Sequence, residues 1–169
     1  DTLLRDHGSI DLDQALQPAI GYAEDGWAVT PRVATDWERN VAKLSVDASS
    51  AAKYLANGQA PKAGETWRLP ELAETLRTIA REGRSGFYKG WVAEDIVQHL
   101  SGLGGCHALD DLAEMRGEYV TPISTDYRGH TMFQIPPNGQ GITALMMLNI
   151  LADYDLASLD PNGVARLHL

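Results

Sequence analysis

The chain has one cysteine, few basic residues and no long apolar run, and each scarcity excludes a class of protein. Cys106 has no second cysteine to pair with, so an internal disulfide framework is excluded. The 14 Lys and Arg against 23 Asp and Glu give a net charge of −9. This charge argues against nucleic acid as the main partner, because phosphate neutralisation needs clustered cations. No apolar run approaches the roughly 20 residues of a membrane span, so none is predicted.

The histidines are too scattered for a metal site on a helix. No two of His7, His99, His130 and His168 have the i, i+4 spacing of helical zinc ligands, and we predict neither a metal nor a cofactor. Cys106-His107 resembles a nucleophile beside a base, but adjacent residues seldom turn their side chains toward each other. We interpret this pair as a structural thiol beside a surface histidine.

Hydrophobic residues are plentiful, at 44% of the chain, and they are interspersed with charge, as is typical of a folded segment with a core. Their spacing is mostly helical. We therefore predict a mainly α segment that carries one small β-hairpin, with a loop over residues 57–68. The expected helices cover residues 12–25, 31–44, 70–81, 91–101 and 109–116, and Pro161-Asn162 is expected to open a last one.

Individual residues predict where some of these helices begin and end, and which of their faces is buried. Asp11 with Gln14 three residues later has the pattern of a capping box, and Gly26 is placed to end that helix in a left-handed conformation. Pro18 removes one hydrogen bond inside the same helix, so we expect a kink or a late start. The third helix, from Pro70, is predicted to turn its apolar residues inward, namely Leu72, Leu76, Ile79 and Ala80.

The most informative stretch covers residues 121–151. Two runs alternate around Arg128-Gly129 with the period of half-buried strands, at Ile123, Thr125 and Tyr127 and then at Thr131, Phe133 and Ile135. Pro136-Pro137 ends the second strand, because proline cannot donate to a ladder. The apolar run 142–151 is too rich in Leu and Met to face water, so we predict a buried helix there.

The candidate site is Asn138-Gly139-Gln140-Gly141, between the two prolines and that helix. Glycine lets the backbone approach a ligand closely, and N–H groups at the start of a helix favour an anion or a carboxylate. The competing interpretation is a tight strand-to-helix corner, in which the glycines only supply positive φ. The nearby Tyr127-Arg128 is predicted to be structural, with the tyrosine packed and the arginine solvated or ion-paired.

The order of these motifs resembles the large subunit of gamma-glutamyltranspeptidases and their cephalosporin-acylase-like relatives. That family joins a P-I-S-x-D-Y-R-G hairpin to a Pro-Pro/Gly corner and to a helix that ends L-N-I-L. The likeness extends over nearly the whole chain. The matching residues are Pro122-Ile123-Ser124, Asp126-Tyr127-Arg128-Gly129, Pro136-Pro137 and Leu148-Asn149-Ile150-Leu151, with further matches at residues 17–20, 23–26, 87–90 and 111–113.

The resemblance implies an N-terminal-nucleophile hydrolase, whose complete fold has four αββα layers. A precursor of this family cuts itself before a threonine, whose freed α-amine then acts as base for its own hydroxyl. That threonine attacks a γ-glutamyl amide and passes the acyl group to water or to an amino acid. The resemblance places the nucleophile in the small subunit beyond Leu169, and the arginine that pairs with the substrate carboxylate before Asp1. No residue of this chain is therefore predicted to be catalytic.

We accordingly expect residues 1–169 to be a single segment from the middle of a large subunit, within a longer precursor. Its expected partners are the remainder of that precursor and, in the full enzyme, a γ-glutamyl or related amide substrate. The β layers on which its helices would pack are mostly outside this segment. We therefore expect the isolated segment to expose an apolar face and to self-associate or bind a hydrophobic dye.

Two alternatives stay open. Glutathione-cleaving members carry a Pro-Pro-Pro-Ser-Ser-Gly-Gly corner, whereas this chain has Pro136-Pro137-Asn138-Gly139-Gln140-Gly141. This difference favours the cephalosporin or glutaryl acylase branch of the family. The other alternative is a helical interaction module without catalytic activity that shares ancestry with the enzymes.

Overall fold

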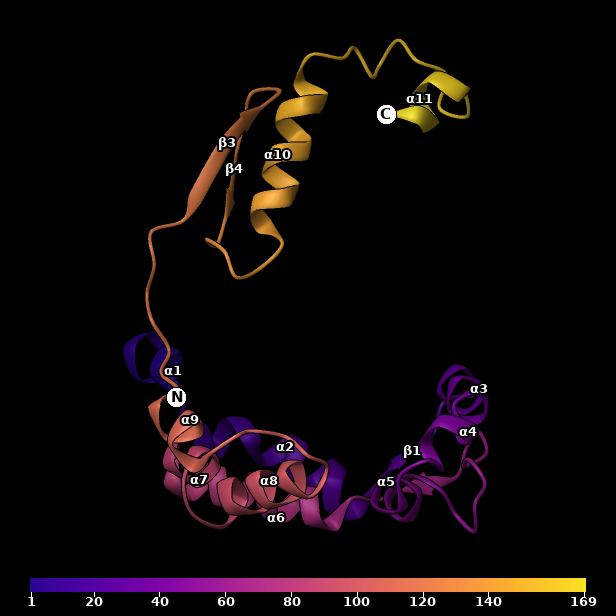
Figure 1. Cartoon of the computed structure of the whole chain (residues 1–169), viewed down its shortest axis with the longest axis vertical. Helices are drawn as coiled ribbons and strands as arrows, with labels where there is room; N and C mark the ends of the chain where they lie inside the picture. The colour runs from indigo at the N-terminus through magenta and orange to yellow at the C-terminus, as the bar shows by residue number, and fades with distance from the viewer. The chain divides into compact units, whose positions relative to one another are not determined.

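The computed structural model describes all residues from 1 to 169, and they form two compact units, Asp1–Arg116 and Gly117–Leu169 (Figure 1). The predicted mainly α fold with a small β-hairpin is confirmed. Unit 1 contains α1 (Thr2–His7), α2 (Leu12–Asp25), β1 (Trp27–Ala28), α3 (Pro31–Arg39), α4 (Val41–Leu44), α5 (Ala48–Tyr54), β2 (Thr66–Trp67), α6 (Pro70–Glu82), α7 (Ser85–Tyr88), α8 (Gly90–Gly102) and α9 (Leu109–Glu114). Unit 2 contains β3 (Ile123–Tyr127), β4 (His130–Gln134), α10 (Gly141–Ala152) and α11 (Val164–His168).

The helical core of unit 1 forms where α2 lies beside α6 and where α7 crosses α6. Gly86 of α7 is buried directly against the backbone carbonyl of Thr78. Small side chains at the crossing let the helices approach closely, as close packing of protein interiors requires. The buried residues of these helices and of α8 are Ile20, Ala23, Ala73, Thr78, Gly86, Val92 and Ala93.

The inward face of α6 differs from the predicted one. Leu72 is 45% exposed, whereas its neighbour Ala73 is fully buried and Thr78 is buried as well. The prediction was wrong for Leu72 because it followed hydrophobicity alone. The helices around α6 come too close for a large side chain at the centre of the contact, so small residues occupy it.

The ends of α2 match the predicted positions, but the capping does not. Asp11 is the N-cap residue, yet its side chain makes no capping hydrogen bond, so the predicted capping box is wrong. Pro18 lies inside a helix that starts at Leu12, so the late start is wrong too. Gly26 ends the helix with φ +93° and ψ 171°, which is positive φ but not the left-handed helical conformation.

Unit 1 also contains a strand pair that the sequence did not predict. β1 pairs antiparallel with β2, with Trp27 opposite Trp67, and β2 lies inside residues 57–68, which were expected to be a loop. Two-residue strands carry no periodicity by which they could be recognised. The helix expected over residues 31–44 is divided at Asn40, where φ −102° and ψ 4° interrupt α3 and begin α4.

Unit 2 is a hairpin covered on one side by a helix. β3 and β4 pair from Ile123 opposite Gln134 to Tyr127 opposite His130. Arg128 at φ 50° and Gly129 at φ 80° form the two-residue turn, and positive φ at both positions matches the twist of a hairpin. α10 packs on this hairpin through the buried Leu145.

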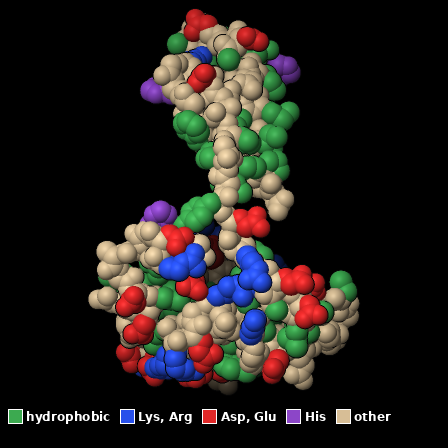
Figure 2. All heavy atoms as spheres, turned by 90° about the vertical axis from the view of Figure 1, so that its left-hand side faces the viewer, with side chains coloured by type: hydrophobic (Ala, Val, Ile, Leu, Met, Phe, Trp, Pro, Cys, Tyr) green, Lys and Arg blue, Asp and Glu red, His purple; other side chains and the backbone are tan.

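Much of the apolar surface of unit 2 has no cover within this chain (Figure 2). The helix α10 contains no charged residue, yet only Leu145 is buried, so the prediction of a buried helix is wrong for this chain. On β4, Phe133 faces away from α10, because the residues opposite Ile123 and Thr125 are Gln134 and Met132. Ile135, just beyond the strand, is exposed. The large apolar residues exposed on β4, just beyond it and on α10 are Met132, Phe133, Ile135, Ile142, Met146, Met147 and Ile150.

A helix that is hydrophobic all round is normally buried on all sides. The exposed apolar face expected from the sequence is therefore present, while self-association of the isolated chain stays a prediction. None of the helices is long and apolar enough to cross a membrane.

Candidate functional site

The corner of unit 2, residues 136–141, joins the end of β4 to the first turn of α10. Asn138, Gly139 and Gln140 are all exposed. Gln140 is the N-cap residue of α10, and its side chain makes no capping hydrogen bond. The first intrahelical bond is donated by the Ala144 N–H to the Gln140 carbonyl at 3.2 Å. The first-turn N–H groups ahead of Ala144 are therefore without intrahelical acceptors and can donate to an acceptor from outside.

The two corner glycines do not supply positive φ, so that part of the structural interpretation was wrong. Gly141 is required by close approach instead. A Cβ at Gly141 would lie 2.8 Å from Gln134 Cβ, 2.9 Å from Gln134 Oε1 and 3.1 Å from the Ile135 carbonyl oxygen. A Cβ at Gly139 would meet only Ile135 Cδ1, at 3.8 Å. Gly141 thus seats the start of α10 against the end of β4, and Gly139 lies in open space.

This difference makes Gly141→Ala and Gly139→Ala a matched pair. We expect Gly141→Ala to destabilise unit 2 by about 2 kcal/mol through overpacking, and Gly139→Ala to have little effect. Amide hydrogen exchange in α10 measures this directly, and it should become about 30-fold faster in the first variant only. Equal exchange in the two variants would contradict the close approach.

The far end of the hairpin is tied to the other end of α10. The Arg128 guanidinium donates to the Tyr154 carbonyl oxygen at 3.0 Å and lies 5.2 Å from the centre of the Tyr127 ring. Arg128 is exposed, as one of the two predicted alternatives had it, and it contacts a carbonyl and a ring instead of forming the ion pair of the other alternative. Between the two ends, Thr125 Oγ1 donates to Asn149 Oδ1. The corner is therefore carried by a hairpin and a helix that are fixed to each other at several points.

Two residues that support the corner were not found by sequence reasoning. Gln134 lies against Gly141, and Asn149 accepts from Thr125. The alternation of the second strand drew attention to Thr131, Phe133 and Ile135, whereas Gln134 and Met132 lie on the α10 side. Asn149 was part of the L-N-I-L motif, but a motif gives no contact partner.

The threonines of unit 2 have hydroxyl groups that form hydrogen bonds, or side chains that are exposed. Thr131 Oγ1 donates to Asp126 Oδ1 at 2.6 Å across the hairpin, while Thr121 and Thr143 are exposed. Cys106 is exposed as well, and no group of three or more potential metal ligands gathers anywhere in the chain.

Two carboxyl groups have pKa values lowered from their ordinary range, and both lie in unit 1. The Ser50 N–H donates to Asp47 Oδ2 at 2.6 Å at the start of α5, which lowers the pKa of Asp47. A hydrogen bond from Lys53 lowers the pKa of Glu71. Each shift follows from a cap or a surface ion pair, so neither marks an acid or base poised for catalysis.

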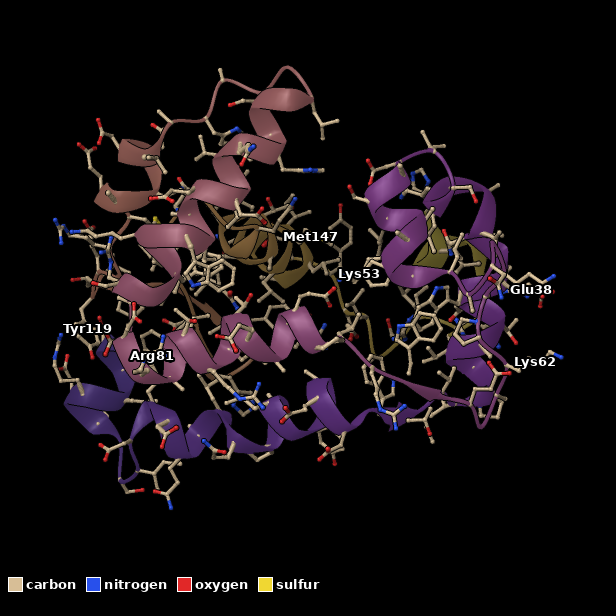
Figure 3. The ribbon with its side chains drawn as sticks, turned by 90° about the horizontal axis from the view of Figure 1, so that it is seen from below. Glu38, Lys53, Lys62, Arg81, Tyr119 and Met147 are labelled. Atoms are coloured by element: carbon tan, nitrogen blue, oxygen red, sulfur yellow. The ribbon has the colours of Figure 1, made fainter.

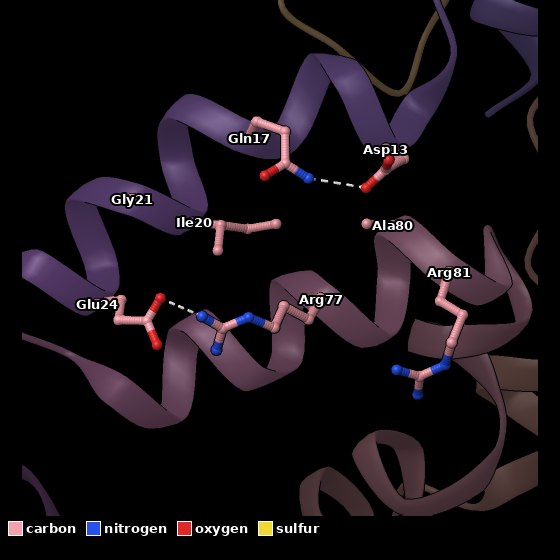
Figure 4. A pocket seen from close by; sticks show the side chains of 8 residues that line it. All are labelled: Asp13, Gln17, Ile20, Gly21, Glu24, Arg77, Ala80 and Arg81. Carbon is pink, nitrogen blue, oxygen red and sulfur yellow. Dashed lines mark hydrogen bonds and ion pairs between the residues drawn. The ribbon is translucent and has the colours of Figure 1, made fainter.

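Unit 1 has a shallow groove between α2 and α6 (Figure 4). Ile20 forms its apolar floor, and a Glu24–Arg77 ion pair closes one end. Gln17 donates to Asp13 at 2.8 Å along the α2 wall. Each charge that lines this groove has a partner: Glu24 pairs with Arg77, Asp13 accepts from Gln17, and Arg81 pairs with Glu82 outside the groove. The exposed pair Glu24–Arg77 contributes little to stability. We therefore regard the unit 2 corner as the stronger candidate site.

Comparison with known proteins places the whole chain in one family. The family model described as Gamma-glutamyltranspeptidase matches residues 1–169. The glutathione hydrolase-like YwrD proenzyme of Bacillus subtilis is 38% identical over 100% of this chain and 32% of its own length. The chain thus spans about a third of that relative.

Two solved structures resemble the chain closely. The gamma-glutamyltranspeptidase of Helicobacter pylori superimposes with a TM-score of 0.90 at 28% identity, over 99% of this chain and 48% of that one. The cephalosporin acylase of Bacillus halodurans superimposes with a TM-score of 0.88 at 37% identity, over 99% of this chain and 32% of that one.

Proposed function

Because the chain belongs to the gamma-glutamyltranspeptidase family, we propose that it is a segment from the middle of the large subunit of an autoprocessed amidohydrolase or acyltransferase. In the complete protein, a threonine supplied by the remainder of the precursor would attack a γ-glutamyl or similar dicarboxylic amide. The amine leaves, an acyl-enzyme forms, and water or an amino acid then takes the acyl group. The observation that carries this proposal is the match of the family model to every residue of the chain.

Within that enzyme, this segment would act as scaffold and as part of the cleft wall. The corner Asn138-Gly139-Gln140-Gly141 is the part proposed to face the cleft. Its support is physical, since an exposed tip with unpaired first-turn N–H groups is held by rigid elements on both sides. The N–H groups of such a tip can donate to a substrate carboxylate, or the tip can pack against a neighbouring chain end. The exposed faces of α10 and β4 would pack on the remainder of the precursor.

The second candidate substrate class is that of the acylases. Its support is the corner sequence together with the likeness to a cephalosporin acylase at 37% identity. The relatives also include an Acylase ACY 1 proenzyme from a Pseudomonas species, which is 34% identical over 96% of this chain. The two classes differ in the acyl group, which carries an α-amino group in a γ-glutamyl donor and lacks it in a glutaryl donor.

The complete precursor provides the test. On maturation, mass spectrometry should show that the precursor is cleaved into two fragments. The N-terminal residue of the downstream fragment should be a threonine. The matured protein should then release p-nitroaniline from γ-glutamyl-p-nitroanilide or from glutaryl-p-nitroanilide, and the ratio of the two kcat/KM values identifies the branch. A single uncut polypeptide that cleaves neither substrate would reject the proposed function and favour an interaction module.

A substitution at Gln140 tests the cleft role of the corner. In the complete enzyme, Gln140→Ala is expected to lower kcat/KM several-fold while the melting temperature and the extent of self-cleavage stay unchanged, because the side chain is exposed and caps nothing. Gln98→Ala, at an exposed position of α8, is the matched control. If kcat/KM also stays unchanged, the corner is a structural turn only.

A further inference from the structure

Unit 1 contains a second groove, far along the chain from the corner, between α3 and the loop of residues 58–63. Its volume is 780 Å³, which lies in the range of small-molecule sites. Most of its lining is apolar or small. The apolar lining residues are Pro31, Ala34 and Val41 on the helical side and Ala60, Pro61 and Ala63 on the loop side.

The loop wall is rigid because the backbone closes on itself twice. Ala56 and Gln59 exchange hydrogen bonds of 2.8 and 3.1 Å around a turn with positive φ at Asn57 and Gly58. Further on, the Glu65 N–H donates to the Lys62 carbonyl at 3.1 Å, and Glu65 Oε2 accepts from the Lys62 N–H at 2.9 Å.

The same loop is fastened to the rest of unit 1. The Val29 N–H donates to the Glu65 carbonyl at 2.9 Å, and the Gly64 N–H donates to the Val29 carbonyl at 2.7 Å. Pro61 and Val29 are both buried. The groove is therefore formed before any ligand binds, which lowers the ordering cost of binding.

The helical wall is fixed from behind. The Trp37 ring lies 5.2 Å from that of Trp67 and 6.2 Å from that of Tyr54, so one side of α3 is held by aromatic packing. Thr30 caps the helix by accepting from the Val33 N–H. Ala34, which lines the groove, therefore lies on a helix that is already held in place before a ligand binds.

Two charged side chains line the groove, one on each wall. Glu38 comes from α3 and Lys62 from the loop, and both lie at the same side of unit 1 in Figure 3. Both are exposed, and neither carboxylate nor ammonium forms an ion pair with another residue. The neighbouring charges Asp36 and Arg39 of α3, by contrast, pair with each other. An apolar groove with an unpaired carboxylate on one wall and an unpaired ammonium on the other can bind both charges and the aliphatic chain of a zwitterion.

We propose that this groove binds an aliphatic zwitterion of the ω-amino acid class, with its ammonium on Glu38, its carboxylate on Lys62 and its methylene chain on the apolar floor. This binding site is distinct from the corner proposed to face the catalytic cleft, and it takes no part in the proposed acyl transfer. Exposed charges interact weakly in water, so the affinity falls in the millimolar range.

The test uses 6-aminohexanoate, with hexanoate and hexylamine as probes that each lack one charge. Titration of the chain should shift the backbone amide resonances of residues 34–41 and 58–63 with a saturating curve. Each single-charge probe should bind at least about 5-fold more weakly. Failure to saturate by about 50 mM, or equal binding of all three probes, would overturn the proposal.

Variants then assign the two charges. Glu38→Gln and Lys62→Gln should each weaken 6-aminohexanoate binding to the level of the corresponding single-charge probe. Glu94→Gln and Lys43→Gln, at exposed positions outside the groove, should bind as the unaltered chain does. The double exchange Glu38→Lys with Lys62→Glu should retain binding, because the ligand can enter in the opposite direction. Loss of binding in that double variant, or unchanged binding in both single variants, would refute the charge assignment.

Discussion

The isolated chain of residues 1–169 is expected to release no p-nitroaniline from γ-glutamyl-p-nitroanilide above a control without enzyme. The chemistry proposed for the family needs a threonine whose own α-amine is free to act as base. Every threonine of this chain lies inside the polypeptide, so each amine is tied up in a peptide bond. Six of the hydroxyl groups are also engaged in hydrogen bonds, namely those of Thr30, Thr35, Thr75, Thr78, Thr125 and Thr131.

The expected effect is large. Removing the nucleophile of a well-studied serine hydrolase lowers kcat by about 10⁶-fold, and the oxyanion donors expected outside this segment would remove more. The measurement compares the repurified chain with the matured complete precursor at equal molar concentration. Turnover that survives repurification and scales with the amount of chain would show that a catalytic group lies within these residues.

Replacing Gly86 by alanine is expected to destabilise unit 1 by about 3 kcal/mol. A Cβ at this buried position would lie 2.6 Å from the Thr78 carbonyl oxygen, 2.9 Å from its carbonyl carbon and 3.1 Å from Ile79 Cα. All three contacts are backbone atoms of α6, which cannot turn away as a flexible side chain would. The helices α6 and α7 must therefore separate, and the packing around the buried Thr78 is lost with them.

Urea unfolding followed by tryptophan fluorescence measures this loss, because all four tryptophans, Trp27, Trp37, Trp67 and Trp91, lie in unit 1. Gly102→Ala is the matched control, since a Cβ at the last residue of α8 would meet nothing within 4 Å. That change should alter stability by less than about 1 kcal/mol. Equal stability of the two variants would contradict the close crossing of α7 over α6.

The corner shows how far sequence reasoning reaches toward a site. The two prolines and the apolar run located the turn between β4 and α10. The role of its glycines was not predictable, because φ values and close approaches depend on where Gln134 and Ile135 come to lie. The groove between α3 and the loop was not predicted at all, since its walls come from two segments joined by the unexpected pairing of β1 with β2.

The sequence by itself determined the helices with strong apolar periodicity, the hairpin around Arg128-Gly129 and, through the order of its motifs, the family. These features follow from local spacing and local turn chemistry. The tertiary structure decided which face of α6 is buried, with Ala73 inward and Leu72 outward, because only the neighbouring helices set the available space. It also decided that α10 stays exposed on most sides in this chain. Hydrophobic residues can be buried only against partners, and within residues 117–169 the hairpin covers one face of that helix.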